Sequence, residues 1–168
     1  MRLSSHRVRL FPDPILLKRC KALATLRFPE FSLDYLSFAH VESLEFSEVL
    51  DDMTRLMRDK QGVGLAAPQV GVPFRFFITD PGFGTPDFVA NPEILDQNEH
   101  RIVRTEGCLS LPGVKVDVTR PSWIRCRWQD RQGAFIEASF EDFAARLFLH
   151  EADHLDGILI GNPEPEIL

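Results

Sequence analysis

The chain has 168 residues, of which 44% are hydrophobic and 26% are charged, and its formal net charge is −6. This balance is typical of a folded globular protein, and we expect a single domain over residues 1–168. No run of Lys and Arg provides the clustered cations that phosphate binding needs, so direct nucleic-acid binding is not expected. Nor does any stretch reach the roughly 18 consecutive apolar residues of a membrane-spanning helix.

The three cysteines, Cys20, Cys108 and Cys126, are odd in number and irregularly spaced. This pattern does not indicate a disulfide framework, and we expect a reducing compartment, the cytoplasm. The first residues, MRLSSHRVRLF, lack the apolar core of a secretory signal, and targeting to an organelle is not expected.

Residues 8–30 contain three prolines and predict an extended N-terminal segment around one short helix. Residues 43–60 predict an amphipathic helix, because apolar side chains recur at helical spacing with charged side chains opposite. Ser43 is a suitable N-cap, and Gly62 and Gly64 end the helix. The expected buried face consists of Phe46, Val49, Leu50, Met53, Leu56 and Met57.

Residues 73–140 consist of short segments rich in β-branched and aromatic residues, which Pro and Gly turns separate, and this pattern is typical of β-strands. In SWIRCRW, side chains alternate, so Ile124, Cys126 and Trp128 predict one buried face. The segment WQDRQGAF predicts a hairpin turn. The order of helix, strands and helix predicts an α+β fold with a mostly antiparallel sheet.

Residues 141–156 return to helical spacing and include most of the sequence LHEADHLDG. Gly157 provides a stop, and residues 158–160 are expected to form a final strand. Four side chains of this helix lie along one face at helical spacing, and the two apolar ones are expected to bury that face. This stripe consists of Phe143, Leu147, His150 and His154.

His150 and His154 are four residues apart, so both imidazoles can reach one metal ion at about 2.0–2.1 Å. Glu151 is rotated from this face by about 100° and can act as a general base toward water at the metal. The alternative is an amphipathic helix with two solvated histidines that bind nothing. Burying two unpaired imidazoles would be costly, which favours the metal site.

A catalytic metal of this kind usually takes three protein ligands and a water molecule. The third histidine of one protease pattern would fall at Ile160, and the acidic residues beyond it lie in a tail interrupted by prolines. Cys108, in TEGCLSLPG, follows a predicted strand and a glycine, and its thiolate is a suitable ligand. Most free cysteines are buried and pack like small apolar side chains, and we assign this role to Cys20 and Cys126. We take Cys108 as the third ligand.

Three stretches, in this order, resemble the signatures of peptide deformylases. They are GVGLAAPQVG at residues 62–71, EGCLS at 106–110 and HEADH at 150–154. The HExxH pattern is shared by many metalloproteases, whereas the other two are far more specific. The resemblance extends to VRLFPDPILLKRC near the start and ARLFLHEADHLDG near the end, so it covers most of the chain.

The resemblance implies an α+β fold in which mostly antiparallel strands surround a central C-terminal helix that carries HExxH, with a helical segment nearer the N-terminus. It implies a hydrolase that removes the formyl group from the N-terminal formylmethionine of newly made proteins. N-formylmethionyl nascent peptides would then be the substrates, and the ribosome would be near. One divalent metal ion is implied, Fe(II) in the cell, with zinc, nickel or cobalt able to occupy the site.

The resemblance also assigns roles to individual residues. Glu151 matches the general acid and base. The side-chain amide of Gln69 and the backbone N–H of Leu109 match the groups that polarise the substrate carbonyl. The metal ligands would be Cys108, His150 and His154. The remaining matches, which contact the bound peptide or support the site, are Val63, Gly64, Glu106, Lys115, Phe143 and Leu147.

Three features depart from the family's pattern: residues 20–42 are longer than the usual linker, Leu149 replaces a frequent glutamine, and Lys115 lies near a frequent arginine. Lysine keeps the charge but loses the planar fork of arginine. Two other functions are weighed. A small HExxH metallopeptidase is disfavoured because no downstream third ligand is found. A metal- or peptide-binding module that has lost its activity is disfavoured because every reactive residue is present.

Overall fold

The computed structural model describes residues 7–23 and 46–161. These residues form an α+β fold, as the sequence predicts. The elements, in chain order, are η1 (Pro14–Leu17), α1 (Phe46–Asp59), β1 (Gly64–Ala66), η2 (Ala67–Val70), β2 (Phe76–Thr79), η3 (Pro81–Phe83), β3 (Phe88–Gln97), β4 (Arg101–Cys108), β5 (Leu111–Pro121), β6 (Trp123–Gln129), β7 (Phe135–Glu141) and α2 (Asp142–Leu155).

Helix α1 buries the whole face that its apolar spacing predicts, because all six expected side chains are buried. Its first residue, Phe46, packs edge-on against Phe76 of β2, with ring centroids 5.1 Å apart. An aromatic pair of this geometry adds to the stabilisation that burial alone provides. The predicted N-cap, Ser43, lies outside the described residues.

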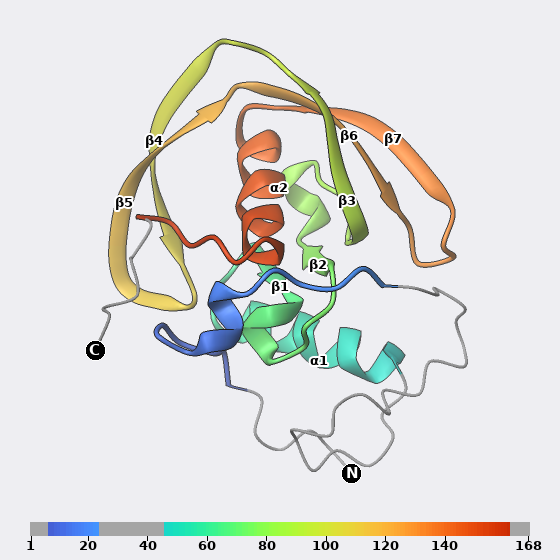
Figure 1. Cartoon of the computed structure of the whole chain (residues 1–168), viewed down its shortest axis with the longest axis vertical. Helices are drawn as coiled ribbons and strands as arrows, with labels where there is room; N and C mark the ends of the chain where they lie inside the picture. Colours follow the sequence, from blue (N-terminus) through green and yellow to red (C-terminus); the bar gives the residue numbers. More distant parts are fainter. Residues whose placement is uncertain (1–6, 24–45, 162–168) are drawn as a thin grey trace.

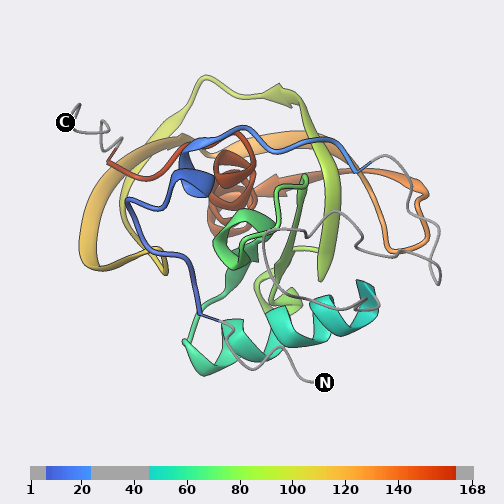
Figure 2. The same ribbon diagram turned by 60° about the horizontal axis from the view of Figure 1, so that its bottom comes forward.

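The main sheet has the strand order β1-β2-β3-β6-β7, and each neighbouring pair is antiparallel. Successive side chains of a strand point to opposite faces. Leu65 and Phe76 therefore pack in the cluster with α1, while Ala66 and Phe77 pack in the cluster with α2. Figure 2 shows the two helices on either side of this part of the sheet. Helix α2 is thus held in the middle of the molecule.

Strands β4 and β5 form a separate two-stranded sheet, which lies on the other side of α2 from β6 and β7 (Figure 1). A small apolar cluster joins the end of this hairpin to the segment after α2 and to η1. Its buried members are Leu16, Cys108, Leu111, Leu159 and Ile160. The hairpin and the main sheet therefore enclose the helix that carries HEADH.

One local prediction is wrong. Residues 158–160 form no strand, because the backbone turns at Gly157, where φ is +75°. The N–H of Ile158 donates to the carbonyl of Asp153, so the segment closes the end of α2 in the manner of a glycine C-cap. Residues 64–66 form β1 and pair with β2.

The remaining strand predictions are confirmed. Ile124, Cys126 and Trp128 are buried on one face of β6. The turn between β6 and β7 closes with the N–H of Asp130 donating to the carbonyl of Ala134. Within the described ranges, no helix has both the length and the apolar character that crossing a bilayer requires.

Candidate metal centre

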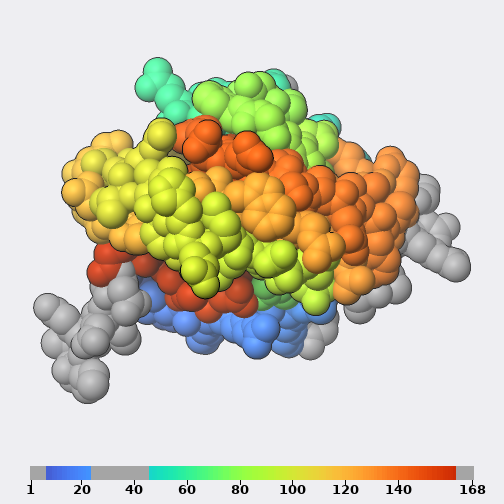
Figure 3. All heavy atoms as spheres, turned by 90° about the horizontal axis from the view of Figure 1, so that it is seen from above, coloured from blue at the N-terminus to red at the C-terminus, as the bar shows by residue number. Residues whose placement is uncertain are grey.

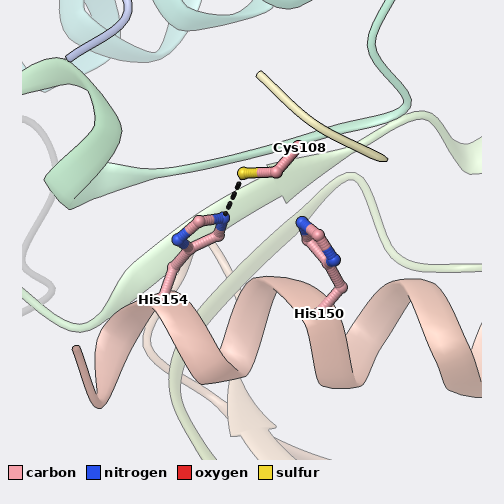
Figure 4. Close-up of side chains that lie close together, drawn as sticks. All are labelled: Cys108, His150 and His154. Atoms are coloured by element: carbon pink, nitrogen blue, oxygen red, sulfur yellow. Dashed lines mark hydrogen bonds between the residues drawn. The ribbon is translucent and has the colours of Figure 1, made fainter. Parts of the chain in front are cut away.

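Helix α2 presents His150 and His154 side by side, and both rings point away from the helix toward Cys108 (Figure 4). Their ring centroids are 5.1 Å apart, as expected for positions one turn apart. His154 is 1% exposed, and burial holds its pKa well below the usual value. The imidazole is therefore neutral, which is the form that binds a metal.

Cys108 approaches this pair from the end of β4. The pairing of β4 with β5 is irregular between Gly107 and Cys108, and such an irregularity re-aims a side chain. The Cys108 Sγ atom lies 3.3 Å from Nε2 of His154. The ligand atoms of Cys108, His150 and His154 all lie within 4.8 Å of one another.

This donor set fits a metal ion. Two imidazole nitrogens and one thiolate match the ligand preferences of zinc, iron, nickel and cobalt. The distances are short enough for one ion to be shared, and three protein ligands leave a position for water or substrate. The predicted ligands are thus brought together, although they come from two elements far apart in the sequence.

Glu106 orients His150, one of the predicted ligands. Its Oε2 atom lies 2.8 Å from Nδ1 of His150, so a proton on Nδ1 leaves Nε2 for a metal. Burial alone would raise the pKa of Glu106, but hydrogen bonds from His150 and Arg120 and the charge of Arg120 lower it to about 2. Glu106 is therefore an ionised carboxylate whose oxygens face neighbouring side chains.

Glu151 lies in the floor of the site beside Gly64 and is 3% exposed. Among the described residues, its Oε2 atom has no hydrogen-bond partner. Burial raises the pKa of Glu151 to about 7, against the opposing charges of His150 and Arg120. A carboxylate with a pKa near neutrality can both accept and return a proton at physiological pH.

Gln69, in η2, is 2% exposed, and both ends of its amide make contacts. Its Oε1 accepts a hydrogen bond of 2.8 Å from the N–H of Ala66. Its Nε2 donates to Oγ of Ser110 at 3.1 Å and lies 3.7 Å from Sγ of Cys108. These contacts fix the amide so that its N–H groups face Ser110 and the Cys108 sulfur, on either side of Leu109 in the chain.

A pocket of about 840 Å³ opens above these groups. Its walls come from the N-terminal segment, from β1 and the segment before it, from η2, from the β4–β5 hairpin and from α2 as far as Glu151. Eleven of the twelve residues that the sequence assigns to the site line this pocket: Val63, Gly64, Gln69, Glu106, Cys108, Leu109, Lys115, Phe143, Leu147, His150 and Glu151. His154 does not line it, and its Nε2 atom lies 3.3 Å from the Cys108 sulfur.

The burial expected for the stripe on α2 holds only in part. Leu147 is buried, but Phe143 is 41% exposed, so the expectation is wrong at that end. Phe143 belongs to the first turn of the helix, where it meets Phe83 of η3 with ring centroids 5.3 Å apart. Figure 3 shows the start of α2 at the surface beside the green segment that carries η3. Phe143 therefore lies at the pocket mouth.

Three charged residues that hold Glu106 and α2 together are missed by the sequence reading. Arg120 donates to both Glu106 oxygens, at 2.7 and 3.0 Å, and to Asp153 at 2.8 Å. Arg146 donates to Glu106 at 2.5 Å. One signal was available, since Arg146 precedes His150 by four positions on an otherwise buried face.

Helix α2 presents HExxH beneath a pocket, and β4 brings a cysteine to the same place. This arrangement defines a metal-dependent hydrolase. Residues 6–163 match the family described as Polypeptide deformylase. The chain belongs to this family of metalloenzymes, which remove the formyl group from the N-terminal methionine of proteins. This confirms the resemblance seen in the sequence and does not favour the metallopeptidase or inactive-module alternatives.

Individual relatives agree. The chain is 40% identical over 155 residues to a peptide deformylase of Thermotoga maritima. The match covers 92% of this chain and 84% of that protein. The chain is 39% identical to one of Clostridium botulinum, with 90% and 91% covered. The crystal structure of peptide deformylase from Thermotoga maritima superimposes with a TM-score of 0.78 at 38% identity, covering 95% of this chain and 98% of that one.

Proposed function

We propose that Cys108, His150 and His154 hold one divalent metal ion and that Glu151 is the proton-transfer residue of formyl hydrolysis. The observation that carries this proposal is the convergence of the three ligand atoms within 4.8 Å at the base of one pocket. When bound, the ion supplies Lewis-acid chemistry that makes water nucleophilic near neutral pH.

The chain's own residues then divide the reaction. Glu151 takes a proton from the water that attacks the formyl carbon. As the bond between that carbon and nitrogen breaks, Glu151 returns the proton to the leaving amine, so formate and a free N-terminus result. The Gln69 amide and the Leu109 N–H stabilise the charge that grows on the carbonyl oxygen; in comparable enzymes, loss of one such donor costs about 3–4 kcal/mol.

The remaining pocket residues bind the peptide. Leu147 and Phe143 offer apolar surface for the methionine side chain, while Val63 and Gly64 offer backbone groups to an extended chain. Lys115 contributes a positive charge toward the far end of the substrate. Glu106 supports the site through His150, because Arg120, Arg146 and His150 already engage its two oxygens.

The test is formate release by the purified, metal-loaded protein from formyl-Met-Ala, compared with acetyl-Met-Ala and with an unblocked peptide. Release from the formyl peptide alone is expected, because a formyl carbon carries only hydrogen and a tight site rejects bulkier acyl groups. Cleavage of an internal peptide bond would instead indicate a peptidase, and absence of turnover with metal bound would overturn the proposal.

We further propose Fe(II) as the ion in the cell. The donor set also suits zinc, nickel and cobalt, so the choice of iron rests on the resemblance to the family. Metal analysis after purification without oxygen is expected to find iron. The iron form should lose activity in air and the nickel form should not, because an iron-bound thiolate is readily oxidised. Zinc as the sole metal would overturn this choice.

Finally, we propose that the substrates are nascent formylmethionyl peptides in the cytoplasm, near the ribosome. The three cysteines of the described chain are free, which suits a reducing compartment. Ribosome-bound formylated nascent chains should be deformylated when the protein is added, as mass spectrometry of the released chains would detect. Retention of the formyl group on such chains, with free peptides hydrolysed, would oppose this placement.

A further inference from the structure

The β4–β5 hairpin forms a sheet of its own, and its base is joined to β3 and β6 of the main sheet, where the N–H of Asn98 donates to the carbonyl of Trp123 and the N–H of Ser122 to that of His100. A two-stranded hairpin is marginally stable by itself in water, so beyond this base side-chain contacts help to decide how it lies against α2. This matters for the metal centre, because the hairpin carries Cys108 whereas the helix carries His150 and His154. The apolar cluster of Leu16, Cys108, Leu111, Leu159 and Ile160 holds only one end of the hairpin.

Arg146 makes a further attachment, beside the contacts of Arg120 with Asp153 and of Glu106 with His150. Its side chain is buried, and its guanidinium reaches both strands of the hairpin from α2. Nη1 donates to the backbone carbonyl of Val118 in β5 at 2.9 Å, and Nη2 donates to that of Ile102 in β4 at 2.6 Å. One side chain therefore joins three elements by directed hydrogen bonds.

The same guanidinium shares a carboxylate with a metal ligand. Nη1 of Arg146 lies 2.5 Å from Oε1 of Glu106, while Nδ1 of His150 lies 2.8 Å from Oε2. Arg146 and His150 are one helical turn apart, so they approach Glu106 from the same face of α2. Arg120 completes the group and also pairs with Asp153. Two guanidinium groups and two carboxylates thus lie in one network, whose members Glu106, Arg120 and Arg146 are buried.

We propose that Arg146 is a positioning residue for the metal centre. It fixes the hairpin, and with it the Cys108 sulfur, relative to the two histidines, and it holds Glu106 in the orientation that turns Nε2 of His150 toward the ion. This inference rests on the proposed ligand set. A planar fork with several donors is needed to reach three acceptors at once, which a lysine ammonium cannot do equally well.

The test compares metal binding by apo-protein of the wild type, Arg146→Met and Arg146→Lys, with Zn(II) and Co(II) as probes. Competition with a chromophoric chelator is expected to show affinity for zinc about 10–100-fold weaker in Arg146→Met, the range typical for loss of a group that supports a ligand. The Co(II)–thiolate absorption band should weaken or shift. Arg146→Lys should fall between the two.

Arg75→Met is the matched control. Arg75 is half-buried and, like Arg146, ties a strand region to α2, since its Nη1 donates to the carbonyl of Leu155 at 3.1 Å and to Asp156 at 2.6 Å. It does not touch Glu106 or the hairpin within the described structure. Loss of the Arg75 contacts should lower the thermal midpoint of unfolding. The affinity for zinc should stay within about twofold of wild type, well below the 10–100-fold loss expected for Arg146→Met.

Wild-type affinity and an unchanged Co(II) spectrum in Arg146→Met would overturn the inference. If that variant does not fold, Arg146→Lys decides, because equal affinity in the lysine variant and the wild type would equally overturn it. Cys108→Ala, measured in parallel, separates this inference from the proposed site. Unchanged metal binding by Cys108→Ala removes the proposed ligand set itself, whereas loss of binding there with full binding in Arg146→Met removes only the role of Arg146.

Discussion

The Cys108 sulfur lies 3.3 Å from Nε2 of His154, although 46 positions separate the two residues in the chain. One belongs to the end of β4 and the other to the last turn of α2. The contact depends on the docking of a hairpin against a helix rather than on local structure. Binding of one metal ion by both groups would therefore depend on the tertiary fold. Loss of metal binding when one of the groups is removed is the most direct test of the site.

Cys108→Ala is expected to abolish stoichiometric metal binding, because two imidazoles alone leave the ion without its thiolate. Elemental mass spectrometry of the purified variant measures its metal content and checks this prediction. Cys126→Ala is the control, since Cys126 is also a buried free cysteine but belongs to the cluster on the other side of α2. The control should retain metal. Equal metal content in both variants would remove Cys108 from the ligand set.

Glu151→Gln is expected to keep the metal and to lower turnover of formyl-Met-Ala by roughly 10²–10⁴-fold, the usual contribution of a general acid and base. The amide has the shape of the carboxylate but cannot take the proton of water. Steady-state formate release and metal content should be measured on the same sample. Turnover within tenfold of wild type, with metal present, would assign proton transfer to another group.

Much of this site could be predicted because its signals are local. The spacing of HEADH places two imidazoles on one face of a helix, and six apolar residues at helical spacing define the buried side of α1. The alternation in SWIRCRW likewise fixes which side chains of β6 are buried. Periodicity of this kind depends only on backbone geometry, so it survives in the fold.

The rest depends on contacts between distant segments. The Glu106–Arg120 and Glu106–Arg146 pairs join positions 14 and 40 residues apart, and no spacing rule reveals such partners. Exposure of Phe143 follows from the open pocket mouth at the start of α2, which helical periodicity does not describe. Residues 158–160 have strand-like composition, but Gly157 turns them onto the hairpin cluster, so packing decides their conformation.

Gly64→Ala is expected to lower kcat at least tenfold with the metal retained. A Cβ at this position would lie only 2.7 Å from the carboxyl carbon of Glu151, so the side chain proposed to transfer the proton must move, and small displacements of a reacting group cost about 10²-fold in rate. Gly84→Ala is the control. Its φ of +79° makes alanine strained, at roughly 1 kcal/mol, but its Cβ meets nothing closer than 3.9 Å.

The comparison separates strain from displacement. Gly84→Ala should unfold at a lower temperature and turn over substrate normally. Gly64→Ala should instead lose turnover, with a smaller change in unfolding temperature. Normal turnover in Gly64→Ala would mean that Glu151 moves aside without cost and is not held in its working position by this contact.

Phe143→Ala is expected to raise KM for formyl-Met-Ala several-fold with a small change in thermal midpoint. The ring is 41% exposed at the pocket mouth, so its removal takes apolar surface from the substrate more than from the core. Phe135→Ala, at a ring that is 67% exposed on β7 and away from the pocket, is the control and should leave KM unchanged. Equal KM values in all three proteins would exclude Phe143 from substrate binding.

The Cys126 thiol is expected to make stability fall with rising pH. Burial raises its pKa from 9.0 to about 12. Below pH 9 the thiol is protonated in both states and has no effect. Above pH 9 the unfolded chain releases the proton while the folded chain retains it up to about pH 12, so the free energy of unfolding falls by up to about 1.4 kcal/mol per pH unit.

Cys126→Ala removes this ionisation and leaves the other titrating groups, including Cys20, whose pKa burial also raises, to about 11. Urea unfolding of both proteins at several pH values between 8 and about 10.5 should therefore give curves that converge as pH rises, because only the wild type loses the Cys126 contribution. Curves that stay parallel over this range would mean that the Cys126 thiol ionises equally in the folded and unfolded chains, and hence that β6 opens to solvent far more readily than its complete burial implies.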